Sequence, residues 1–122
     1  VRTPIGDAWI RAEDEGEFRA EPQPPAPVRL LPSGDAYYLL QGDDRELLIS
    51  DPERRAALWP SRVWPGALLV KGEIVGTWRR KDHVVTAQPW QQLTRAARDA
   101  IEAEAETLPL PGLTASPVVH WS

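Results

Sequence analysis

Hydrophobic and polar residues alternate most regularly between Gly66 and Gln88, where three short apolar runs follow one another. The runs cover residues 67–70, 73–80 and 83–88, and the last is rich in the Val and Thr that strands favour. Lys71-Gly72 and Lys81-Asp82 are short polar connections between them. The pattern predicts an antiparallel three-stranded meander, with either a type I′ turn or a type I turn with a glycine bulge at Lys71-Gly72.

Strict alternation along the middle strand assigns its residues to two faces. Ile74, Gly76, Trp78 and Arg80 would share one face, and Val75, Thr77 and Arg79 the other. Because Trp78 lies on the same face as Ile74, we expect its ring to be buried.

Shorter apolar runs predict further strands at residues 28–31, 37–40 and 118–121, and two more within residues 1–11 around a Gly6-Asp7 turn. Residues 32–35 read as a turn, and the acidic residues 13–17 as a turn or a frayed helix. The fold class is therefore mainly β with two helices, an α+β fold. We expect six to eight short strands in a small, partly closed β-barrel or rolled antiparallel sheet, with 118–121 closing the edge.

Capping signals place the two helices. Asp51 can cap a helix that begins at Pro52 and ends by Trp59, since Pro60 disfavours helical geometry at the residue before it. Thr94 can cap a longer helix that ends near Pro109. Its apolar residues recur at helical spacing and should face the sheet: Leu93, Ala97, Ile101, Ala105 and Leu108.

The proline distribution suggests how the chain is organised. Residues 1–122 read as one domain, in which an N-terminal strand flap (1–20) joins a main body (28–122) through the proline-rich linker 21–27. The chain begins at Val1 and contains no methionine, so we expect a C-terminal piece of a longer protein.

Composition narrows the functional classes. The chain has no cysteine, which excludes a disulfide framework and a thiolate metal site. No apolar run approaches the roughly 18 residues that span a membrane, and a cytoplasmic protein is expected. The net charge of −4 is unfavourable for non-specific DNA binding, so any DNA contact must come from a local basic patch.

The residue pattern does not indicate a catalytic site. The two histidines, His83 and His120, lie far apart in sequence without a ligand pattern, and no carboxylates form a recognisable pair. We therefore expect no catalytic residue, no cofactor and no metal in this chain. The basic candidates for contacting DNA are Arg79, Arg80 and Lys81 at a hairpin end, with Arg62, Lys71 and the helical pair Arg54-Arg55. A solubilising strand end is the alternative reading.

Several segments, in this order and spacing, resemble the C-terminal part of the winged-helix DNA-binding protein family that includes the AlkZ-like crosslink-repair DNA glycosylases. They are Val28-Arg-Leu-Leu-Pro, Asp44-Arg-Glu-Leu-Leu, Asp51-Pro-Glu-Arg-Arg, Leu58-Trp-Pro, Val70-Lys-Gly-Glu-Ile-Val-Gly-Thr-Trp-Arg-Arg, Pro89-Trp and Leu93-Thr-Arg-Ala. The chain departs from the family pattern at Ser33-Gly34-Asp35-Ala36, where an apolar-Asp-Pro turn is usual.

The resemblance implies a β-barrel that packs beside winged-helix domains of the same protein and contacts double-stranded DNA. It also implies that base excision uses a Gln-apolar-Gln or Gln-apolar-Asp motif located upstream. Gln41-Gly42-Asp43 fits only superficially, because its middle residue is glycine, and we read it as a turn. The expected function is an accessory domain that positions DNA in a repair protein. The alternative is a structural or protein-interaction domain of a winged-helix protein without glycosylase activity.

Overall fold

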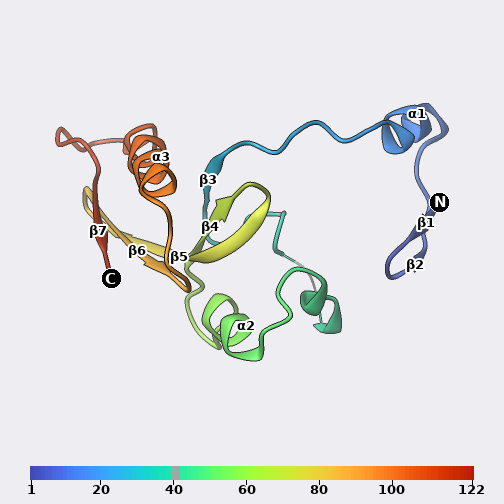
Figure 1. The fold of residues 1–122 in the computed structure, drawn as a ribbon, viewed down its shortest axis with the longest axis horizontal. Coiled ribbons are helices and arrows are strands. Elements are labelled where there is room, and N and C mark those ends of the chain that lie inside the picture. The colour runs from blue at the N-terminus through green and yellow to red at the C-terminus, as the bar shows by residue number, and fades with distance from the viewer. Residues whose placement is uncertain (40–41) are drawn as a thin grey trace.

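A five-stranded sheet forms the centre of the protein in the computed structural model, which describes residues 1–39 and 42–122. The strands are β3 (Val28–Leu31), β4 (Gly66–Val70), β5 (Glu73–Lys81), β6 (Val84–Pro89) and β7 (Val118–Trp121). Their order in the sheet is β3-β4-β5-β6-β7, and only the β6–β7 pair is parallel (Figure 1).

The α+β class is confirmed, but the sheet is mixed and does not close into a barrel. Helix α3 (Arg95–Glu106) connects β6 to β7 and contacts both edge strands, β3 and β7. A crossover through a helix returns the chain in the same direction, which makes β7 parallel to β6. Helix α3 covers one face of the sheet, so that face is buried without closure.

The predicted meander is confirmed as β4, β5 and β6. Lys71 and Gly72 both adopt positive φ (50° and 83°), as a type I′ turn requires. The second turn lies one residue later than expected, at Asp82-His83, because Lys81 pairs with Val84. Asp82 takes the left-handed conformation there (φ 53°), which its short polar side chain tolerates better than lysine would.

A β-bulge interrupts the alternation along β5. Leu69 pairs with Ile74 and Leu68 with Gly76, so Val75 has no partner in β4. Because a bulge inserts one extra residue, the side chains before it and after it no longer alternate in step, and positions two or four residues apart can point to opposite faces. Ile74 and Trp78 therefore pack into different hydrophobic clusters, and the prediction that they share a face is wrong.

The two clusters lie on opposite faces of the sheet. The α3-side cluster contains the whole predicted helical stripe, with Val28, Leu30, Leu68, Val75, Val85, Ala87 and the rings of Trp78 and Trp121. The α2-side cluster contains Tyr38, Ile49, Leu58, Trp59 and Ala67, with partly buried Leu31, Leu48, Trp64, Ile74 and Trp90. Figure 1 shows helices α2 and α3 on either side of the strands.

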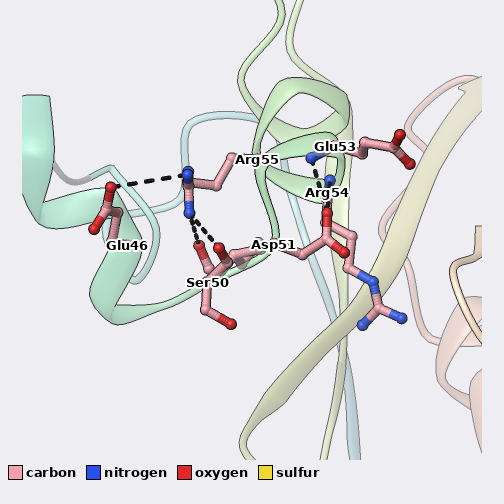
Figure 2. Close-up of polar contacts among 7 residues, drawn as sticks. Glu46, Ser50, Asp51, Glu53, Arg54 and Arg55 are labelled. Carbon is pink, nitrogen blue, oxygen red and sulfur yellow. Dashed lines mark hydrogen bonds and ion pairs between the residues drawn. The ribbon is translucent and has the colours of Figure 1, made fainter.

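The two predicted helices, α2 and α3, begin at the predicted caps. Helix α2 (Pro52–Leu58) follows Asp51, whose Oδ1 accepts hydrogen bonds from the backbone N–H groups of Glu53 (2.8 Å) and Arg54 (3.1 Å) (Figure 2). Thr94 Oγ1 accepts from the N–H of Ala97 (3.1 Å) at the start of α3. Helix α3 ends at Glu106, short of the expected Pro109, and Leu108 still packs against the cluster.

The strand predicted at 37–40 is wrong for its described residues, because residues 36–38 form a turn. Tyr38 is fully buried in this turn, and its hydroxyl lies 2.7 Å and 2.9 Å from the carbonyl oxygens of Pro32 and Pro65. The same oxygen accepts a hydrogen bond from the N–H of Gly34 (3.1 Å). Leu40 and Gln41 lie outside the described residues, so the turn read at Gln41-Gly42-Asp43 is only partly described; the 3₁₀ helix η2 spans Gly42–Leu47.

The N-terminal arm, residues 1–27, precedes the sheet. It contains β1 (Arg2–Thr3), β2 (Gly6–Asp7), the 3₁₀ helix η1 (Ala12–Asp14) and α1 (Glu15–Arg19), then an extended segment that runs to β3. Gly6-Asp7 forms a strand and not the predicted turn, because the turn is made by Pro4-Ile5, where proline fixes a suitable φ. Figure 1 shows β1, β2 and α1 away from the sheet.

Candidate nucleic-acid interface

The C-terminal end of β5 presents three cations on two faces. Arg80 follows Trp78 onto the α3 side, where both line a hollow with Leu110, and its Nη1 donates to the carbonyl oxygen of Asp82 (2.6 Å). Alternation directs Arg79 and Lys81 to the opposite side, and both are exposed. The three cations therefore divide into a pair and a single residue.

Arg79 joins this strand end to the loop that precedes β4. Its Nη2 donates to the carbonyl oxygen of Val63 at 3.0 Å, which places the exposed Arg62 next to the same contact. Lys71 lies in the turn at the other end of β5. At the usual rise per residue of a strand, it is about 25 Å from Lys81 along the strand. The structure thus associates Arg62, Arg79 and Lys81, and it separates Lys71 and Arg80 from them.

The cations of helix α2 have partners within the domain. Arg55 Nη1 donates to the carbonyl oxygens of Ile49 (2.9 Å) and Ser50 (2.6 Å), and its Nη2 lies 3.8 Å from Glu46 Oε1 (Figure 2). Arg54 points away from this group, and its guanidinium lies 5.6 Å from the centre of the Trp90 ring. These contacts connect α2 to the segments around it.

Sequence reasoning missed Arg45, which lies over two tryptophan rings, 5.0 Å from the centre of Trp59 and 5.5 Å from that of Trp64. Such cation–π contacts join residues distant in sequence, so no local pattern indicates them. Five of the six tryptophans pack in the two clusters, as expected for tryptophans that build a core, and Trp78 is only partly buried. Trp9 in the N-terminal arm is fully exposed.

Two glutamates of helix α3 have structural contacts. Glu102 Oε1 accepts from Trp121 Nε1 (2.9 Å), and Glu104 lies 3.6 Å from Arg29. Burial raises the pKa of Tyr38 above its ordinary value.

Among residues 1–39 and 42–122, no group of three or more His, Cys, Asp or Glu side chains is arranged to hold a metal ion. In the same residues, no helix is both long and apolar enough to cross a membrane.

Comparisons with known proteins agree with this architecture. The structure matches the Streptomyces sahachiroi DNA glycosylase AlkZ with a TM-score of 0.66 and 24% sequence identity, over 93% of this chain and 30% of that one. The likeness establishes a shared fold, over less than a third of the length of AlkZ. No curated protein matches the sequence. The family described as DNA glycosylase AlkZ-like matches residues 1–109. Because that match covers most of its residues, the chain belongs to the AlkZ-like DNA glycosylase family.

Proposed function

We propose that this chain is a C-terminal accessory domain of an AlkZ-like DNA-repair protein, and that it positions double-stranded DNA without supplying the catalytic residues. Family membership supports a role in DNA repair. The observation that carries the DNA-binding role is the exposed group Arg62, Arg79 and Lys81. Arg79 and Lys81 share one side of β5, and the contact between Arg79 and the Val63 carbonyl brings the strand end next to the loop that holds Arg62. Winged-helix domains of the same protein would supply the glutamine motif and complete the DNA channel.

Exposed arginine and lysine side chains at a strand end suit the sequence-independent contacts that proteins make with phosphates. The chain as a whole carries −4, so the binding must come from this local group. We expect binding to be weak at physiological salt and measurable at low salt, where Debye screening is small.

The test replaces Arg79 and Lys81 with glutamine, which removes charge and keeps hydrogen-bond donors. Each phosphate contact contributes about one unit to the slope of log affinity against log salt, so the double variant should lose about two units. Fluorescence anisotropy with a short duplex over a salt series measures both affinity and slope. Several duplex sequences should be affected about equally.

A matched control is the double variant Arg11→Gln/Arg19→Gln, which removes the same charge from the N-terminal arm. Both arginines are exposed, and in the part of the chain that the structure describes their ion pairs are with nearby carboxylates. The control should leave the salt slope unchanged. If the two double variants weaken binding equally, Arg62, Arg79 and Lys81 act only through the net charge of the chain. If neither variant weakens binding, these three residues do not bind DNA.

The second candidate function is a protein-interaction domain, and the N-terminal arm favours it. Ile5, Trp9 and Phe18 are half or more exposed there, with Trp9 at 101% relative exposure. Exposed aromatic residues are typical anchors of protein interfaces. Replacing Trp9 and Phe18 with serine should then abolish association with a partner domain and leave DNA affinity unchanged.

A further inference from the structure

The half of the sheet formed by β5, β6 and β7 has one face covered by α3 and an opposite face that carries polar side chains. Trp78, Val85 and Val119 belong to the α3-side cluster, as do Ala87 and Trp121. Because side chains alternate along a strand, their neighbours point to the other side. Those neighbours are Thr77, Arg79, Lys81, Val84, Thr86, Gln88, Val118 and His120.

Strand pairing arranges these neighbours in rows across the sheet. Arg79 pairs with Thr86, and Thr86 pairs with His120, so the three side chains stand side by side on adjacent strands. The row extends over about 10 Å, two inter-strand spacings. Lys81 begins a second row with Val84 and Val118. Arg79 and His120 are exposed, Thr86 is half-buried, and Val118 is 47% exposed.

The α2-side cluster stops short of these rows. It includes Ala67, Trp64 and Ile74, which lie on β4, on the loop before it and at the start of β5. The buried Thr77 pairs with Ala67 at the limit of that cluster. Beyond Thr77, toward Lys81 on β5 and across β6 and β7, the face is at least partly exposed.

The charge of this face is the reverse of that of the whole chain. None of its eight side chains is a carboxylate, while Arg79 and Lys81 are cations and Arg62 lies on the adjoining loop. Seven of the 18 acidic residues lie at residues 13–17 of the arm and at Glu102, Glu104 and Glu106 of α3, and the exposed Asp82 lies in the turn after Lys81. A surface with cations, a hydroxyl, an amide and an imidazole, and without carboxylates, is complementary to a phosphodiester backbone.

We infer that a DNA strand crosses this face, with its phosphates along the row Arg79–Thr86–His120, and that Lys81 and Gln88 flank the row. The inference rests on the proposed function and extends it, because it adds Thr86, Gln88 and His120, which the sequence does not connect with Arg79. The sheet, and not only its strand end, is then the DNA-binding surface.

The test adds a negative charge to the row. Thr86→Glu and His120→Glu should each weaken duplex binding about tenfold at low salt, through repulsion of phosphate next to Arg79. The matched control is Gln91→Glu, an exposed position in the segment before α3, which should change affinity by less than twofold. Thermal unfolding of every variant identifies a loss caused by misfolding.

His120 lies exposed on an edge strand, so His120→Glu keeps the test valid even if Thr86→Glu does not fold. Amide chemical shifts of the unmodified chain provide a second measurement. Adding a short duplex should move the signals of Arg79, Thr86 and His120 more than those of α3.

The possible results separate the two proposals. If the Arg79/Lys81 glutamine variant weakens binding and neither glutamate variant does, the inference is overturned and the proposed function stands. If no variant weakens binding, both are rejected. If an acidic peptide shifts the signals of the row and a duplex does not, the face binds protein, and the inference is again overturned.

Discussion

At the scale of single residues, Tyr38 ties the turn after β3, within residues 32–39, to the core. Its ring is buried with Trp59, whose Nε1 donates to the Tyr38 carbonyl oxygen (3.0 Å). Its hydroxyl reaches two carbonyl oxygens and one N–H, from the turn after β3 and from Pro65 just before β4. A buried hydroxyl needs such partners, and here they come from two loops distant in sequence.

Replacing Tyr38 with phenylalanine should lower the free energy of unfolding by about 1–3 kcal/mol, because the carbonyl and N–H groups lose their partner. The control is Tyr37→Phe, since the exposed Tyr37 hydroxyl donates only to the Gly72 carbonyl oxygen; its effect should be smaller. Urea unfolding at pH 7 measures both. Equal effects of the two variants would contradict a special role for Tyr38.

The raised pKa of Tyr38 also predicts a pH dependence. The unfolded chain releases the hydroxyl proton near pH 10, before the folded chain does, so the folded state binds more protons above that pH. Stability from this group is present below pH 10 and falls as pH rises toward the folded pKa. Urea unfolding between pH 9 and 11 should show the fall in the unmodified chain and in Tyr37→Phe, and a smaller one in Tyr38→Phe.

At the scale of elements, the β4–β5 hairpin combines a tight turn with a bulge. The type I′ turn places a lysine at positive φ, which costs conformational energy in a non-glycine residue. The bulge at Val75 lets β5 contribute to both clusters, and Gly76 follows it directly. Turn and bulge together set which side chains face α3 and which face α2.

Lys71→Asn should stabilise the protein by about 0.5–1 kcal/mol, since asparagine tolerates the left-handed conformation better. Thermal or urea unfolding measures the gain. The same variant should leave duplex affinity almost unchanged, because Lys71 lies at the far end of β5 from Arg79. A stability loss would be inconsistent with the type I′ turn.

Gly76→Ala should destabilise the sheet by about 2 kcal/mol or more, as overpacking against fixed atoms does. The added Cβ would lie 2.5 Å from the carbonyl oxygen of Gln88 and 2.7 Å from Pro89 Cα, both backbone atoms. The matched control is Gly16→Ala in α1, where the new Cβ meets nothing within 4 Å. Urea unfolding should separate the two variants; similar values would mean that β5 and β6 can move apart.

At the scale of the whole molecule, charge and apolar surface are unevenly distributed. The arm and α3 carry acidic groups, the β5–β6–β7 face carries cations, and the arm exposes aromatic residues. Under the proposed function, the β5–β6–β7 face would contact DNA. Under the second candidate function, the exposed aromatic residues of the arm would contact protein.

We predict that the 122-residue chain alone releases no modified base from alkylated DNA, because the proposed role is positioning and the catalytic glutamine motif would lie in the winged-helix part. Incubation with alkylated duplex and chromatographic analysis of free bases measures this. The accessory role would be rejected if the chain released base and a substitution of one of its own residues abolished that release.

The melting temperature should not change on adding a chelator, which checks for a structural metal.

The local elements could be read from the sequence alone because their signals are local. Asp51 before Pro52 begins a helix, Thr94 begins another, and two apolar runs around Lys71-Gly72 form a hairpin, each through contacts within a few residues. The basic candidates could be named for the same reason. Family membership is likewise carried by the sequence.

Only the tertiary structure decided which of these residues meet. The parallel pairing of β7 and the turn around Tyr38 depend on contacts between segments far apart in the chain. The bulge at Val75 lies within a local hairpin, but regular alternation does not indicate it. The row Arg79–Thr86–His120 combines the register of the β5–β6 hairpin, which is shifted by one residue from the prediction, with the long-range pairing of β6 and β7. Alternation sets which way side chains point along a regular strand, and short turns place β4, β5 and β6 side by side. The crossover through α3 places β7 next to β6.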